Sequence, residues 1–144
     1  MRKAIIMDLD GTLCDGSEFL HLGDHAYHEA AVTVAMPNPD MVTVINEAIT
    51  RNWDILVMSG RSELWAEASG EWMRRHGLHF DALYFRARHD WRPNRKVKKE
   101  LLLQARSDGY NPTIAYDDDP RNIAMFRECG LVAVTVGHFD TRLS

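Results

Sequence analysis

Apolar and polar positions along this chain predict strands and helices that alternate. Short apolar runs typical of buried strands cover Lys3 to Met7, Asp54 to Met58, Ala82 to Phe85, Thr113 to Tyr116 and Leu131 to Val136. Patterns with a helical period lie over Pro37 to Asn52, Ser62 to Arg75, Asn94 to Ser107 and Pro120 to Glu128. Residues 14–36 show no clear pattern, apart from a helical piece from Asp24 to Val34.

This alternation predicts an α/β fold. Strands separated by helices of this length form βαβ units, so we expect a doubly wound, Rossmann-like parallel sheet of about five strands. Right-handed crossovers place helices on both faces, and ligands bind at the carboxyl ends of the strands. With 144 residues, 45% of them apolar, the chain has the size of one domain, expected over residues 1–144.

Polar side chains follow the predicted strands at that edge. Asp8 and Asp10 follow the first strand, Ser59-Gly60-Arg61 follows the second, and Asp117-Asp118 follows the fourth. The helix that carries Lys98 starts at the same edge. The four groups are therefore expected to form one site.

The carboxylates predict phosphoryl transfer. Of Asp8 and Asp10, one can attack phosphorus while the other handles the proton. Two carboxylates repel a phosphate dianion, so the site needs a divalent cation and basic groups. The adjacent acids Asp117 and Asp118 suit Mg²⁺, which binds a few carboxylates and keeps several waters.

Three lysines lie near the start of one predicted helix. Asn94 is the expected N-cap, which places Lys96, Lys98 and Lys99 in the first turn. Cations there oppose the helix dipole, so their presence indicates that an anion is recruited. Periodicity does not choose among the three, because all of them flank Val97.

The net charge of −4 argues against general nucleic-acid binding, but the charge is uneven. The segment from Arg86 to Lys99 holds seven basic residues and one acid, a net charge of +6. Such a patch indicates focused anion binding. We expect Arg88 and Arg92 to bind substrate, and Trp91 can stack on a base.

The remaining features bear on location and on a possible second site. Two isolated cysteines, a short apolar run after Arg2-Lys3, and no membrane-spanning stretch predict a cytoplasmic protein with reduced thiols.

His21, His25 and His28 recur at near-helical spacing. A solvated or substrate-facing histidine face is favoured there over a second metal site.

The stretch Asp8-Leu9-Asp10-Gly11-Thr12-Leu13 after a strand resembles the first motif of the haloacid dehalogenase (HAD) phosphohydrolase superfamily. The later motifs occur in order along the whole chain. The resemblance implies that Asp8 is the nucleophile and Asp10 the general acid/base. It also implies that Ser59, with Gly60 and Arg61, binds the transferring phosphate, and that Lys98 offsets negative charge. Mg²⁺ would be held by Asp8, Asp117, Asp118 and the backbone carbonyl of Asp10.

Further segments resemble the 3′-phosphatase domain of phage polynucleotide kinase-phosphatases: Val57 to Arg61, Asp90 to Arg92, Val97 to Leu101 and Ala115 to Asp118. That family has an acid where this chain has Asn94. Neither cap-insertion region, Cys14 to Met36 or Arg86 to Val97, holds a cap of usual size. The resulting open, HAD-like site can admit the end of a polymer or a phosphoprotein.

The resemblance therefore implies a Mg²⁺-dependent phosphomonoester hydrolase that forms an aspartyl-phosphate and removes a terminal 3′-phosphate from nucleic acid. The kinase motif G-x-x-x-x-G-K-[ST] does not occur, so a separate kinase or ligase is a candidate partner. The alternative enzyme is a small-molecule 5′(3′)-nucleotidase. A receiver-like phospho-acceptor domain is disfavoured, because the third strand ends in Tyr84-Phe85 without an aspartate.

Overall fold

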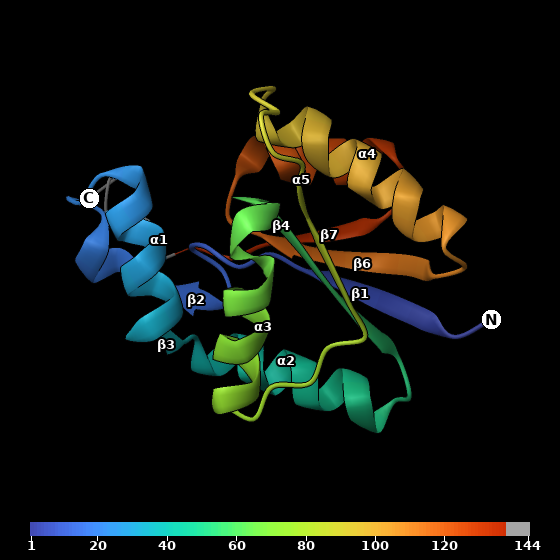
Figure 1. The fold of residues 1–144 in the computed structure, drawn as a ribbon. Helices are drawn as coiled ribbons and strands as arrows, with labels where there is room; N and C mark the ends of the chain where they lie inside the picture. Colours follow the sequence, from blue (N-terminus) through green and yellow to red (C-terminus); the bar gives the residue numbers. More distant parts are fainter. Residues whose placement is uncertain (138–144) are drawn as a thin grey trace.

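A parallel β-sheet forms the centre of the computed structural model, which describes residues 1–137 (Figure 1). Its five strands lie in the order β5-β4-β1-β6-β7, and all neighbouring pairs are parallel. The strands are β1 (Lys3–Met7), β4 (Asp54–Ser62), β5 (Ala82–Arg86), β6 (Asn111–Asp117) and β7 (Val132–Thr135). The predicted α/β class with a parallel sheet is confirmed.

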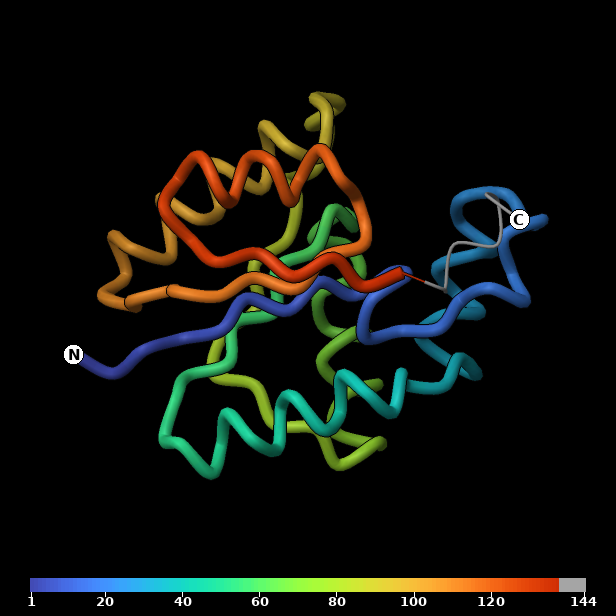
Figure 2. The backbone as a smooth tube through the Cα atoms, turned by 180° about the vertical axis from the view of Figure 1, so that it is seen from behind, coloured from blue at the N-terminus to red at the C-terminus, as the bar shows by residue number. Residues whose placement is uncertain are grey.

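Helices cover both faces of the sheet (Figures 1 and 2). One face carries α2 (Pro39–Thr50) and α3 (Ala66–Arg75), and the other carries α4 (Asn94–Ser107) and α5 (Pro120–Glu128). Successive strand side chains point to opposite faces, so β1 contributes to two apolar layers. Ile5 and Met7 pack with Trp72 of α3, whereas Ile6 packs with Leu102 and Phe126 of α4 and α5.

The segment between β1 and α2 folds into a small insert at the carboxyl edge of the sheet. It contains β2 (Cys14–Asp15), the 3-10 turn η1 (Ser17–Phe19), α1 (Asp24–Thr33) and β3 (Met36–Pro37). Strands β2 and β3 pair antiparallel, which the sequence did not predict. Trp72 of α3 donates its Nε1–H to the carbonyl of Ala35 at 2.9 Å, which ties the insert to the main body. Within residues 1–137 the elements include no large cap, as expected.

Several helices and strands begin or end at residues other than those predicted, for identifiable reasons. Helix α2 begins at Pro39 because Asn38 caps it, its Oδ1 accepting from the backbone N–H of Asp40 at 3.0 Å. The helix expected from Ser62 starts later, since β4 runs on to Ser62 and the turn η2 (Glu63–Trp65) precedes α3. In residues 1–137, no helix combines the length and apolar character needed to cross a membrane.

Candidate active site

Polar groups at the carboxyl ends of β1, β4 and β6 meet in one pocket of about 940 Å³. Each strand ends at the same edge of the sheet, which is why residues far apart in sequence converge there. The pocket lining includes seven groups from the predicted motifs: Asp8, Asp10, Gly11, Gly60, Arg61, Lys98 and Asp118.

A buried lysine joins two of these strands. Lys98, the fifth residue of α4, donates to Asp8 Oδ1 at 2.8 Å and to Asp117 Oδ2 at 2.6 Å. Burial alone would lower the pKa of Lys98, but these two carboxylates raise it, so the ammonium stays charged. Lys96 and Lys99 point into solvent. The geometry therefore separates Lys98 from the two lysines that share its turn.

Three carboxylates crowd together beside this lysine. Oxygens of Asp8, Asp117 and Asp118 all lie within 4.8 Å of one another. Burial, together with the charge of Asp117, raises the pKa of Asp8 well above its usual value and that of Asp118 to about 6. A divalent cation would relieve this repulsion, and a set of carboxylate oxygens is what Mg²⁺ prefers. These residues therefore fit the expected metal.

Neighbouring residues hold the carboxylates in place. Thr12 donates its hydroxyl to Asp8 Oδ2 at 2.9 Å, and Asn122 of α5 donates to both oxygens of Asp117 at 3.3 Å. At Gly11, where φ is +77°, an added Cβ would overlap the Asp118 carboxylate. Only glycine meets both demands, so the turn after β1 depends on it.

Asp10 is held by a buried arginine. The Nε and Nη2 atoms of Arg61 donate to Asp10 at 2.8 and 2.7 Å, and Nη1 donates to Ser69 Oγ at 2.8 Å. Tyr27 of α1 adds a hydrogen bond from its hydroxyl to Asp10 Oδ1 at 2.9 Å. Burial alone would raise the pKa of Asp10, but the guanidinium holds it below its usual value. Arg61, which was expected to bind phosphate, is therefore hydrogen-bonded to Asp10 and Ser69 in the structure.

Ser59 and Gly60, expected to follow the second strand, lie within it, because β4 continues to Ser62. Ser59 is buried, and its Oγ accepts from the backbone N–H of Arg61 at 3.0 Å. A Cβ at Gly60 would collide with the Asn94 side chain. Asn94 accepts a hydrogen bond from Arg86 and is not the N-cap of α4, since Pro93 takes that position. The expected N-cap role of Asn94 is wrong: its side chain lies against Gly60 of β4 instead.

The two expected substrate arginines lie outside the main pocket. Arg92 donates to Asp90 at 2.7 Å and to Glu100 at 2.5 Å, so two carboxylates already bind its guanidinium. Arg88 is exposed on the loop before α4, and Trp91 on the same loop is 85% exposed. None of these three residues lines the main pocket.

The insert supplies further pocket residues, and the sequence pattern singled out His28 among them but not Tyr27. Tyr27 and His28 of α1 line the pocket. His28 also contacts the Trp65 ring, with centroids 5.6 Å apart. Within the described part of the chain, the histidines of the insert do not gather into a metal-holding group. His28 thus fits the substrate-facing interpretation better than the second-metal one.

Replacing Arg61 by alanine is expected to lower the free energy of unfolding by about 3 kcal/mol, because one partner of a buried ion pair is lost. The Arg61 side chain is 2% exposed. Arg74→Ala is the matched control, since its ion pair with Glu71 is exposed and worth under about 1 kcal/mol. Urea unfolding measures both. Equal midpoints for Arg61→Ala and the wild type would contradict the structural role of this pair.

Comparison with known proteins places the chain in a family. Residues 2–140 match the family described as the polynucleotide kinase PNKP phosphatase domain. A chain of the Pnkp1/Rnl/Hen1 complex superposes with a TM-score of 0.83 at 27% identity, over 97% of this chain and 47% of that one. A chain of the Pnkp1/Rnl/Hen1 RNA repair complex gives the same TM-score and identity, over 97% of this chain and 44% of that one. This chain therefore spans about half the length of those relatives.

More distant structures share the fold. A haloacid dehalogenase-like hydrolase from Streptococcus pneumoniae superposes with a TM-score of 0.67 at 14% identity, over 95% of this chain and 87% of that one. No curated protein matched the sequence. The family match extends over nearly the whole chain and includes every residue of the site described above. The chain belongs to the polynucleotide kinase PNKP phosphatase domain family, and its fold is that of the haloacid dehalogenase-like hydrolases.

Proposed function

We propose that this chain is a Mg²⁺-dependent phosphomonoester hydrolase that removes a terminal 3′-phosphate from nucleic acid. The observation that carries the proposal is the buried contact of Lys98 with Asp8 and Asp117. Lys98 and Asp8 line the pocket together with Asp10. Membership of the family supports the same chemistry. It leaves the receiver-domain alternative without support.

In the proposed mechanism, a carboxylate oxygen of Asp8 attacks phosphorus, and the bond from phosphorus to the ester oxygen breaks. Asp10 donates a proton to the leaving oxygen and then takes one from the water that hydrolyses the aspartyl-phosphate. Lys98 and Thr12 fix the two oxygens of Asp8. When bound by Asp8, Asp117 and Asp118, Mg²⁺ supplies positive charge that offsets the phosphate dianion.

Arg61 governs the proton on Asp10 in this scheme. Beside the guanidinium the carboxylate is ionised, which is the form that accepts a proton from water. For the first step Asp10 must instead carry a proton. The pair with Arg61 therefore has to loosen when the substrate's leaving group approaches.

Metal removal tests the cofactor. Hydrolysis of p-nitrophenyl phosphate is expected to stop in EDTA, because the crowded carboxylates then repel the phosphate, and to return when Mg²⁺ is added in excess. The measurement is the steady-state rate before and after chelation. Full activity in EDTA would refute the metal-dependent mechanism.

Substrate choice is tested with three phosphomonoesters. We expect kcat/KM to be highest for a 3′-phosphorylated oligonucleotide. Its 5′-phosphorylated isomer and a 3′-mononucleotide should both give lower values than that substrate. The oligonucleotide rate should fall with added salt, as basic contacts to the backbone are screened. If the mononucleotide is hydrolysed as well as the oligonucleotide at every salt concentration, the small-molecule nucleotidase alternative is correct.

The proposed partners follow from the substrate. A phosphorylated nucleic-acid end in the cytoplasm is the expected target, and a separate kinase or ligase is the expected protein partner. Because one of the similar chains comes from an RNA repair complex, RNA oligonucleotides are the first substrates to try beside DNA.

A further inference from the structure

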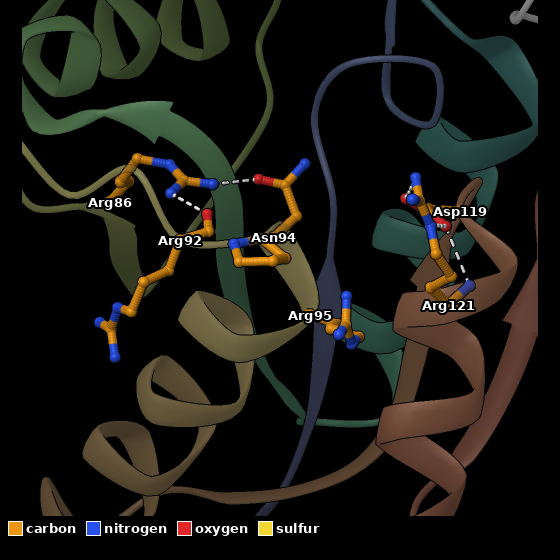
Figure 3. Close-up of a pocket in the computed structure, with 7 residues that line it drawn as sticks. Arg86, Arg92, Asn94, Arg95, Asp119 and Arg121 are labelled. Atoms are coloured by element: carbon orange, nitrogen blue, oxygen red, sulfur yellow. Dashed lines mark hydrogen bonds and ion pairs between the residues drawn. The ribbon is translucent and has the colours of Figure 1, made fainter.

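A second, smaller pocket of about 290 Å³ adjoins the active site (Figure 3). Four arginines line it: Arg86, Arg92, Arg95 and Arg121. The two pockets share Asn94, Asp119 and Arg121, so a ligand can extend from one into the other. The pocket lies between the start of α4 and the start of α5.

Two of these arginines build the wall of the pocket. Arg86 donates to the carbonyls of Gly60 and Asp90, each at 2.9 Å. The guanidinium of Arg92 is already paired with Asp90 and Glu100. Both side chains are therefore fixed by groups of the protein itself and give the pocket its shape.

The other two arginines can reach a ligand. The Arg95 side chain forms no hydrogen bond or ion pair with any residue of 1–137, and Figure 3 shows it between Asn94 and the Asp119–Arg121 pair. Arg121 pairs with Asp119 at 3.1 Å, while its side chain stays 76% exposed. The carboxylate in the pocket lining, Asp119, pairs with Arg121 and forms no ion pair with Arg95, which leaves the charge of Arg95 unmatched among residues 1–137.

Helix α4 adds to this excess. Its first turn carries no acidic residue, and Arg95 and Lys96 lie there. Each of these cations opposes the dipole of the helix, so an anion bound beside Arg95 gains from both the side chain and the free backbone N–H groups. Guanidinium groups suit phosphate oxygens in particular, because their planar donors match two oxygens at once.

We propose that this pocket is a phosphate subsite, which binds the phosphate one nucleoside to the 5′ side of the reacting 3′-phosphate through Arg95 and Arg121. The inference rests on the proposed function, since it takes the active site to hold a 3′-phosphate. Successive phosphates of a nucleic-acid strand are one nucleoside apart, and the two adjoining pockets provide a place for each. The subsite makes the enzyme recognise a strand end rather than a lone nucleotide.

Two small substrates isolate this contact. A nucleoside 3′-phosphate and the corresponding nucleoside 3′,5′-bisphosphate differ only in the phosphate that the subsite would bind. The measured quantity is the ratio of kcat/KM for release of the 3′-phosphate, bisphosphate over monophosphate. For the wild type we expect a ratio of about ten or more, the effect of one charge-assisted contact.

Arg95→Ala should bring that ratio close to one, whereas Arg95→Lys, which keeps the charge, should retain part of it. The matched control is Arg51→Ala, which removes the same charge at the end of α2, on the opposite edge of the sheet. Arg51→Ala should keep the wild-type ratio. A ratio that is equal in the wild type and in Arg95→Ala would overturn the subsite.

The same assay distinguishes failure of the subsite from failure of the proposed function. If the wild type releases 3′-phosphate from both compounds at equal kcat/KM, the subsite is wrong and the 3′-phosphatase activity stands. If it hydrolyses p-nitrophenyl phosphate but neither nucleoside compound, the 3′-phosphate substrate and the subsite are both wrong. Arg121→Ala, as a second variant, should lower the ratio in the same direction as Arg95→Ala.

Discussion

Asp8→Asn is expected to lower kcat by at least about 10⁴-fold for every phosphomonoester, the scale seen when a nucleophile is removed. The amide is nearly the same size as the carboxylate but cannot form a phosphoryl-enzyme. The remaining residues of the pocket, Lys98 and Asp117 included, keep their positions. The rate with p-nitrophenyl phosphate in excess Mg²⁺ is the measurement.

The control for this variant is Asp40→Asn, at the exposed start of α2, which makes the same chemical change away from the pocket. It should retain the wild-type kcat. Thermal unfolding of both variants shows that they are folded. If Asp8→Asn kept activity within tenfold of the wild type, Asp8 would not be the nucleophile.

Lys98→Ala is expected to lower kcat by about 10²-fold or more, the effect of losing one strong charge-stabilising contact in a buried site. The variant also leaves two buried carboxylates, Asp8 and Asp117, without their ammonium partner. We therefore expect the free energy of unfolding to fall by about 3 kcal/mol, and kinetics must be measured where the variant is folded.

Lys96→Ala and Lys99→Ala are matched controls, because both lysines share the first turns of α4 with Lys98 but face solvent. They should leave kcat close to the wild-type value and change mainly KM for a charged substrate. Equal losses of kcat at all three positions would refute the assignment of Lys98.

Much of the fold is predictable because its elements carry strong local patterns. The bounds expected for β1, α4 and α5 are those observed, since continuous apolar runs and clear helical spacing mark them. The helix expected to start at Ser62 starts at Ala66 instead, because β4 extends past the point where its apolar run ends. The insert over residues 14–37 lacks such a pattern, and its form depends on contacts such as Trp72 with Ala35.

The residues of the candidate site likewise fall into those that the sequence could place and those that it could not. Residues at strand ends, such as Asp8 and Asp117, could be placed from topology alone. The partner of Arg61 could not, because the pair with Asp10 joins residues 51 positions apart. The place of Arg121 could not be predicted for a related reason: nothing local to α5 shows that it lines a pocket with the start of α4.

The most direct test of the account is to locate the phosphoryl group on the protein. Rapid mixing with a phosphomonoester and Mg²⁺, an acid quench and reduction with borohydride would convert an aspartyl-phosphate into homoserine, which mass spectrometry of the peptides identifies by position. If Asp8 is the nucleophile, homoserine is expected at position 8 in the wild type. Homoserine at another aspartate, or phosphate release from Asp8→Asn at the wild-type rate, would contradict it.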